Sequence, residues 1–171
     1  MLKVIGSILV IGCCTLLGYS ASGRIKQRIK ALRGLLTALT LMKSEICDLL
    51  TPMPELLKLL SQQLKPPASL MFLNCHAFMF EGGSRSFRDS WRRAVLETKD
   101  LCLLGEEEEI LCELGVSLGR YNIEEQRKAI EKAEKRLELF LELEEKDKAD
   151  RSKINTVLGL GTGITLAILL F

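Results

Sequence analysis

The residue types that most often carry out catalysis or bind metals are scarce in this 171-residue chain. It contains one histidine, His76, and aromatic residues make up only 5% of it. It has no phosphate-binding glycine loop ending in Lys-Ser or Lys-Thr, no HExxH motif and no CxxC motif. His76 lies beside Cys75 in an apolar run, with no second histidine for a metal and no evident nucleophile arrangement. We therefore expect no enzymatic activity, no cofactor and no metal site.

The cysteines also lack the paired spacing of a metal site. Four of the six fall in a segment that we expect to lie in the reducing cytoplasm, where disulfides are rare. We interpret them as free and mostly packed thiols. They are Cys13, Cys14, Cys47, Cys75, Cys102 and Cys112.

Charge is absent from two long stretches, residues 4–23 and residues 154–171. A helix over the second stretch would be about 27 Å long, close to the roughly 30 Å hydrocarbon core of a bilayer. Gly159 and Gly163 would weaken a soluble helix, whereas glycine is common in membrane helices. We therefore predict transmembrane helices over residues 1–23 and over residues 154–171.

A cleaved leader is the competing interpretation of the first uncharged stretch. Val10-Ile11-Gly12-Cys13 resembles a lipoprotein cleavage site, and cleavage there would give an outward-facing lipoprotein. The apolar run continues past Cys13 to Tyr19, however, and a cleaved product would leave it exposed. We favour an uncleaved span and keep the lipoprotein as an alternative.

Basic residues flank both predicted spans on their inner sides. Residues 24–33 contain five basic residues and no acid, and residues 146–153 contain four basic residues. The positive-inside rule then places residues 24–153 in the cytoplasm and both termini across the membrane. Such basic flanks would also attract anionic membrane lipid.

The net charge excludes one class of partner. Of the 24 basic residues, Lys3 lies outside the central segment, which leaves 23 basic against 22 acidic residues and a net charge of +1. A nucleic-acid-binding domain usually has a clear excess of positive charge, which this segment lacks, so we expect no nucleic acid partner.

The central segment has the periodicity of helices only. Apolar residues recur at steps of three and four, and Gly, Pro, Ser and Asn punctuate the segment where helices would begin or end. We predict an all-α bundle. Its expected helices cover Ile25–Leu49, Glu55–Leu64, Ala68–Phe80, Phe87–Thr98, a stretch after Gly105 as far as Leu118, and a last helix after Asn122.

Two of these helices carry a row of apolar residues, a seam, that could pair with a partner helix. One seam lies in Ile25–Leu49, after the first predicted span, and the other lies in Ile130–Phe140, before the second span. The two helices would therefore leave one membrane side by side. We predict that they form a coiled-coil-like antiparallel pair.

Four glutamates, Glu106 to Glu109, open one predicted helix. Acids in a first turn are favoured by the helix dipole, and a docking patch for a basic partner is the functional alternative. Trp91 is expected in the core. Gly115 and Gly119 lie four apart and predict a close approach by another helix. We assign Trp91, Gly115, Gly119 and Gln126 to packing of the module, and Glu106, Glu107, Glu108 and Glu109 are the candidates for a partner interface.

An ordered set of short features runs through the chain. They are Glu45-Ile46, Thr51-Pro52, Ser90-Trp91, Leu114-Gly115-x-x-Leu118-Gly119 and Gln126. Together with the hairpin layout, this set resembles the stage III sporulation protein AB family over nearly the whole chain. The family is similar to the cytoplasmic module of type II secretion F proteins. The resemblance implies a role in the channel complex between mother cell and forespore, with a cytoplasmic hexameric secretion-type ATPase and other membrane proteins of that complex as partners.

The chain also departs from the secretion F pattern. Those proteins have two helical modules and at least three spans, whereas this sequence predicts one module and two spans. Self-association would be needed to build an equivalent platform, and Gly159 and Gly163 provide a possible packing face between membrane helices. We expect a membrane-anchored assembly platform. A passive coiled-coil membrane tether is the alternative of a different class.

Overall fold

The computed structural model describes the backbone of residues 2–81, 86–119 and 122–170, and the side chains of residues 23–81, 86–119 and 122–147. Over these residues it contains six α-helices, one short 3-10 helix and no strand, so the predicted all-α class is confirmed. The elements are α1 (Leu2–Cys47), α2 (Met53–Gln63), α3 (Ala68–Phe80), α4 (Phe87–Glu97), η1 (Lys99–Leu101), α5 (Gly105–Leu118) and α6 (Ile123–Leu170).

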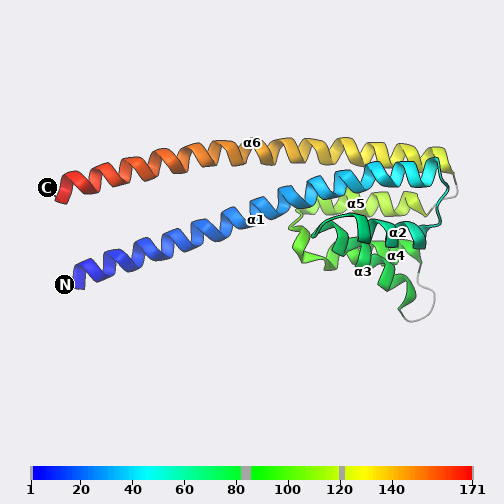
Figure 1. Ribbon diagram of the computed structural model, residues 1–171, viewed down its shortest axis with the longest axis horizontal. Helices are drawn as coiled ribbons and strands as arrows, with labels where there is room; N and C mark the ends of the chain where they lie inside the picture. The colour runs from blue at the N-terminus through cyan, green and yellow to red at the C-terminus, as the bar shows by residue number, and fades with distance from the viewer. Residues whose placement is uncertain (1, 82–85, 120–121, 171) are drawn as a thin grey trace.

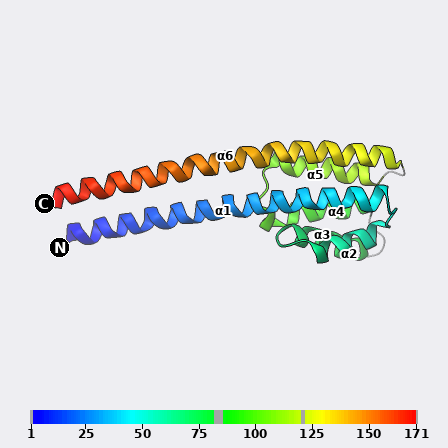
Figure 2. The ribbon, with the colours of Figure 1, turned by 45° about the horizontal axis from the view of Figure 1, so that its top comes forward.

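The two long helices organise the molecule. Helices α1 and α6 run antiparallel and side by side, and they form the most extensive contact between any two elements. The four shorter α-helices pack beneath one end of this pair, and both long helices extend beyond them in the same direction (Figures 1 and 2). We call the packed part, residues 24–147, the head. The first turns of α1 and the last turns of α6 lie at the opposite end of the molecule from the short helices (Figure 1).

The end of α1 is fixed by a local hydrogen-bonded turn. The Thr51 hydroxyl donates to Glu45 Oε2 over 2.6 Å, and the Thr51 N–H donates to the Glu45 carbonyl over 2.9 Å. Between them Leu50 adopts a left-handed backbone with φ of 55°. Pro52 then forms the N-cap of α2, where its missing N–H costs no hydrogen bond. These contacts turn the chain back so that α2 can pack with α3.

A single apolar core joins the helices of the head. Its largest side chains include Trp91, Phe72 and Met42, all of which are almost fully buried. Helix α3 reaches the core at a place where α1 has a glycine: a Cβ atom on Gly34 would lie 2.8 Å from the Cβ of Ala68. Any side chain at Gly34 would push α3 away from α1.

Among the residues whose side chains are described, no helix has an apolar stretch long enough to cross a membrane. The predicted span over residues 154–171, and the predicted span over residues 1–23 apart from Gly23, lie outside the described side chains. The helical backbone passes through both predicted domain boundaries without a break, since α1 includes residues 23 and 24 and α6 includes residues 153 and 154.

Candidate interaction surface

Glu107, in the first turn of α5, is fully buried and forms an ion pair with Arg28 of α1. Arg28 Nη2 donates to Glu107 Oε1 over 2.7 Å, and Arg28 Nε lies 3.2 Å from both carboxylate oxygens. Arg28 Nη1 also donates to Glu144 Oε1 of α6 over 2.7 Å. This cluster therefore ties α1, α5 and α6 together at the end of the head from which the long helices extend.

The same carboxylate also satisfies the backbone where α5 begins. The N–H of Leu104, the N-cap residue, donates to Glu107 Oε2 over 2.8 Å. A side chain with no exposed surface cannot contact a separate protein. The structure thus corrects the assignment of Glu107 as a partner-interface residue, because its carboxylate is used inside the fold.

The other three glutamates of the run remain accessible. Glu106 and Glu109 are exposed and Glu108 is half-buried. Successive residues of an α-helix are turned by about 100° relative to one another, so residues two apart point to nearly opposite sides. Within the run, therefore, the carboxylate of Glu107 stabilises the fold and the other three carboxylates are accessible to a partner.

Beside these glutamates, a hollow of about 370 Å³ lies between α4 and α5. We call it the α4–α5 hollow. The α4 wall is basic and also holds a leucine, and the α5 wall is acidic and also holds a cysteine and a valine. The lining side chains are Arg88, Arg92 and Leu96 of α4 and Glu108, Glu109, Cys112, Glu113 and Val116 of α5.

The basic wall of this hollow is free to meet a partner. Arg88 and Arg92 are exposed, and neither has a carboxylate within 4.0 Å among the residues with described side chains. Burial raises the pKa of the nearby Cys112 thiol, the positive charge of Arg92 opposes that rise, and Glu108 and Glu109 reinforce it. Cys112 is therefore an uncharged part of the floor.

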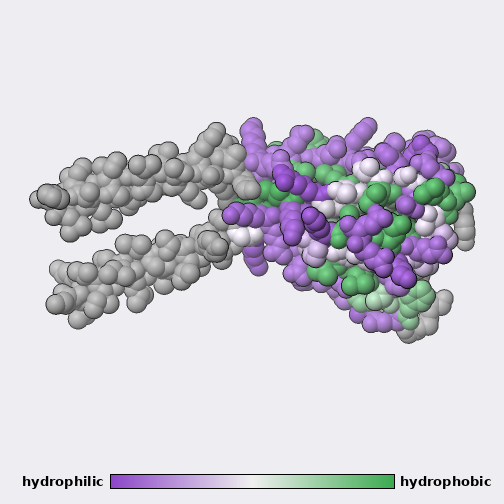
Figure 3. All heavy atoms as spheres, in the orientation of Figure 1, coloured by the Kyte–Doolittle hydropathy of each residue, from purple (hydrophilic) through white to green (hydrophobic). Residues whose placement is uncertain are grey.

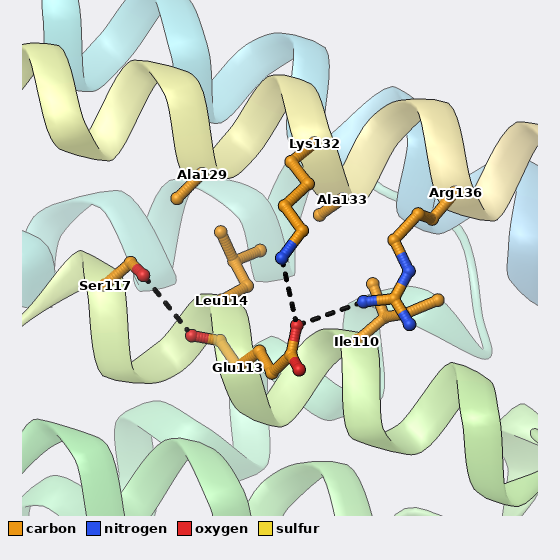
Figure 4. A pocket seen from close by; sticks show the side chains of 8 residues that line it. All are labelled: Ile110, Glu113, Leu114, Ser117, Ala129, Lys132, Ala133 and Arg136. Atoms are coloured by element: carbon orange, nitrogen blue, oxygen red, sulfur yellow. Dashed lines mark hydrogen bonds and ion pairs between the residues drawn. The ribbon is translucent and has the colours of Figure 1, made fainter.

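Figure 4 shows how the other face of α5 is held against α6. Arg136 donates to Glu113 Oε2 over 3.0 Å, and Lys132 lies 3.6 Å from the same oxygen. Small side chains of α6, Ala129 and Ala133, face α5 here across a hollow of only about 50 Å³. Glu113 therefore joins the acidic wall of the α4–α5 hollow to α6.

Trp91 and Gly115 form the apolar support under the hollow. The Trp91 Nε1–H donates to the Leu111 carbonyl over 2.7 Å, and the ring packs edge-on against Phe72 with centroids 5.9 Å apart. A Cβ atom on Gly115 would lie 2.2 Å from Trp91 Cδ1. The close approach at Gly115 is therefore made by the indole side chain.

Gly119 is the C-cap of α5, and Gln126 of α6 lies beside the same helix end. Among the described residues no close approach is observed at Gly119, where the nearest atom to an added Cβ would be the Val116 carbonyl oxygen at 3.9 Å. Gln126 is buried, and its Nε2 donates to the Leu118 carbonyl over 3.1 Å. Gln126 thus satisfies a backbone acceptor that the end of a helix leaves open.

Among the described side chains, no group of three or more His, Cys, Asp or Glu residues could hold a metal ion. Cys47, Cys75, Cys102 and Cys112 are free thiols. Gly159 and Gly163, the predicted packing pair between membrane helices, lie outside the described side chains.

The sequence gives no site prediction for Arg88 and Arg92, and it predicts Arg28 only as one of the membrane-proximal basic residues that could contribute to the ATPase contact. A signal for the basic wall was present, because Arg88, Arg92 and Leu96 recur at a spacing of four and must share one face of a helix. No local signal marks Arg28 as the partner of Glu107, since the two are 79 positions apart.

Comparisons with known proteins agree with this architecture. The profile of a family described as Stage III sporulation protein AB matches residues 3–171. A solved structure of stage III sporulation protein AB is similar to this chain, with 26% sequence identity and a TM-score of 0.65, over 72% of this chain and 98% of that one. None of the curated proteins matches the chain.

Proposed function

Because the chain belongs to the stage III sporulation protein AB family, we propose that it is a membrane-anchored assembly platform in the channel complex between mother cell and forespore. Family membership itself gives the chain a role in stage III of sporulation. In the proposal, the extensions of α1 and α6 are two membrane spans and the head lies in the mother-cell cytoplasm. The head binds a hexameric secretion-type ATPase, and the chain has no enzymatic activity of its own.

The α4–α5 hollow carries the docking part of this proposal. Its α4 wall offers Arg88 and Arg92, which have no carboxylate partner among the described side chains, and its α5 wall offers accessible glutamates. Each wall also holds one apolar residue, Leu96 in α4 and Val116 in α5. A groove that combines apolar side chains with charges of both signs suits an amphipathic helix with complementary charges. We assign the ATPase to this surface.

The packing beneath the hollow supports a rigid docking surface. Trp91 of α4 is hydrogen-bonded to α5, and the Glu107–Arg28 pair fixes the start of α5 to α1. The walls of the hollow are therefore held at a fixed spacing, which lowers the entropy cost of ordering them on binding. Copies of the chain and other membrane proteins of the complex would surround the head in the assembled platform.

The experiment that tests the docking uses the full chain reconstituted in lipid nanodiscs and the purified ATPase. Binding is measured by biolayer interferometry for the native chain and for two double reversals in the walls of the hollow, R88E with R92E and E108K with E109K. Like charges placed opposite one another across an interface cost several kcal/mol, so each reversal should weaken binding at least tenfold, about 1.4 kcal/mol. Binding should also weaken as the salt concentration rises.

The matched control is the double reversal E138K with E142K, which makes the same charge change at two exposed glutamates of α6. This variant should bind like the native chain. If a folded, inserted protein fails to bind the ATPase, docking is overturned and the passive membrane tether becomes the better account. Equal losses in all three double variants would also contradict docking in the α4–α5 hollow, because they would show a general charge effect.

A further inference from the structure

A second basic region lies at the end of the head from which α1 and α6 extend. Two neighbouring hollows of about 430 Å³ and 310 Å³ share Lys30 of α1 and Pro66 of the loop between α2 and α3. Lys26 lines the first hollow and Lys65 lines the second. The side chains that form this basic region come from the first helix and from a loop that the fold brings beside it.

The lysines of this region have no acidic partners. Lys26, Lys30 and Lys65 are exposed, and none lies within 4.0 Å of a carboxylate among the side chains that the structure describes. Asp100 is the acidic residue that lines the first hollow. Arg33 lines the second hollow but is already paired with Glu145 at 2.7 Å. The pair of hollows therefore has an excess of uncompensated positive charge.

Apolar groups accompany the lysines at this end of the head. Pro66 is exposed and Leu70 is half-buried at the rim of the first hollow. Figure 3 shows hydrophilic side chains gathered around the place where the long helices leave the head. Lysines interleaved with apolar tips are typical of surfaces that sit at the boundary between lipid headgroups and acyl chains.

We propose that Lys26, Lys30 and Lys65 bind the phosphate of an anionic lipid headgroup in these two hollows. The inference rests on the proposed membrane anchoring, which places this end of the head against the bilayer. A free phosphate would use the lysines alone, whereas a lipid also accounts for the apolar Pro66 and Leu70 beside them. Bound lipid would fix the tilt of the head relative to the membrane.

The test uses the full chain in nanodiscs of phosphatidylcholine alone or of phosphatidylcholine mixed with phosphatidylglycerol. Lysines are acetylated with a water-soluble reagent and the modification of each one is measured by mass spectrometry. The three lysines should be modified several-fold more slowly in discs that contain phosphatidylglycerol. Lys128 and Lys135, which are exposed on α6 away from the hollows, should react equally in both discs.

A pair of variants locates the site. The double substitution K30Q with K65Q should reduce the phosphatidylglycerol retained by the chain in native mass spectrometry by about fivefold for each lysine removed. The matched control, K128Q with K135Q, should retain as much as the native chain. The emission of Trp91 verifies that each variant is folded.

Three results would overturn the proposal. Equal modification of Lys26, Lys30 and Lys65 in the two kinds of disc would show that no anionic headgroup reaches them. Protection by glycerol phosphate added to discs of phosphatidylcholine alone would make the ligand a soluble anion. A chain that does not co-purify with discs at all would remove the membrane anchor itself, and that failure is distinct because it is seen before any lysine is modified.

Discussion

Glu107 and Glu109 belong to the same run of four glutamates, yet α5 directs their side chains to different environments. Glu107 is fully buried against Arg28, whereas Glu109 is exposed on the acidic wall of the α4–α5 hollow. The two positions differ by about 200° around the helix axis. A run of like charges is thus divided by helical geometry into a residue that holds the fold and residues that are free to bind.

The two faces of α5 should therefore respond differently to substitution. Removing the buried Glu107 carboxylate leaves Arg28 with Glu144 as its remaining partner, and water does not replace the lost ion pair. An exposed carboxylate loses little when it is removed, because water solvates the site. Unfolding experiments followed by the fluorescence of Trp91, the only tryptophan in the chain, measure this contrast directly.

The largest effect is expected for E107A. This change leaves Arg28 nearly buried without its main partner and leaves the Leu104 N–H without its acceptor. It should lower the free energy of unfolding by about 3 to 5 kcal/mol in guanidinium titrations. E109A, two positions away, is the matched control and should change it by less than about 0.5 kcal/mol. Similar losses of unfolding free energy in both variants would show that Glu107 is no more important to the fold than Glu109.

The second effect is steric. In G115A the new methyl group would overlap the Trp91 ring, whose Nε1–H is held by the Leu111 carbonyl. The cost of overpacking predicts a loss of about 2 to 3 kcal/mol, with a shift in Trp91 emission as the ring is displaced. G119A adds the same methyl group at an open position of the same helix and should leave the emission unchanged. An unshifted spectrum in G115A would show that the indole does not need this space.

The third effect depends on pH. Burial raises the pKa of the Cys75 thiol from 9.0 to about 12. The folded state therefore keeps this proton at pH values where the unfolded state loses it, so stability is complete below pH 9 and falls as the pH rises from 9 toward 12. At pH 10 the loss should be about 1 kcal/mol. C75A should lack this part of the pH dependence, and an identical profile for the native chain and C75A would contradict the assignment.

The smallest effect is expected where α5 meets α6 at the surface. The R136A substitution removes an ion pair whose side chains are 38% and 52% exposed. Surface pairs of this kind contribute little, and Lys132 remains close to Glu113, so the loss should be about 0.5 kcal/mol or less in the same titrations. A loss as large as that of E107A would mean that the α5–α6 pair is as important as the buried cluster.

Much of the architecture could be predicted from local patterns. The helix expected over Ala68–Phe80 is observed with the same bounds, and those expected over Phe87–Thr98 and up to Leu118 differ by at most one residue at the ends that were predicted. The start of α6 shows a local cap of the kind that such patterns predict, because Asn122 Oδ1 accepts from the Glu124 N–H over 3.0 Å. Such contacts depend on neighbours in the chain and so leave a signature in the sequence.

The candidate site was predicted less completely. The sequence predicts the run from Glu106 to Glu109 as a possible interface, but it does not predict that Glu107 is buried. That burial depends on Arg28 of α1, which also pairs with Glu144 of α6. Within the described part of the chain, the close approach expected at Gly115 and Gly119 is present only at Gly115, where Trp91 reaches the glycine. A spacing of four places two glycines on one helical face without saying what lies opposite each.

The sequence by itself determined the helices, their ends and the all-α class, because periodicity and capping act over a few residues. Only the tertiary structure decided which glutamate is buried, which glycine lies against another side chain, and which arginines lack a carboxylate partner among the described side chains. The partners of Arg28 are 79 and 116 positions away, and its side chain can meet Glu107 and Glu144 only once α1, α5 and α6 have packed. Burial, and with it the strength of a charge interaction, is a property of that packing.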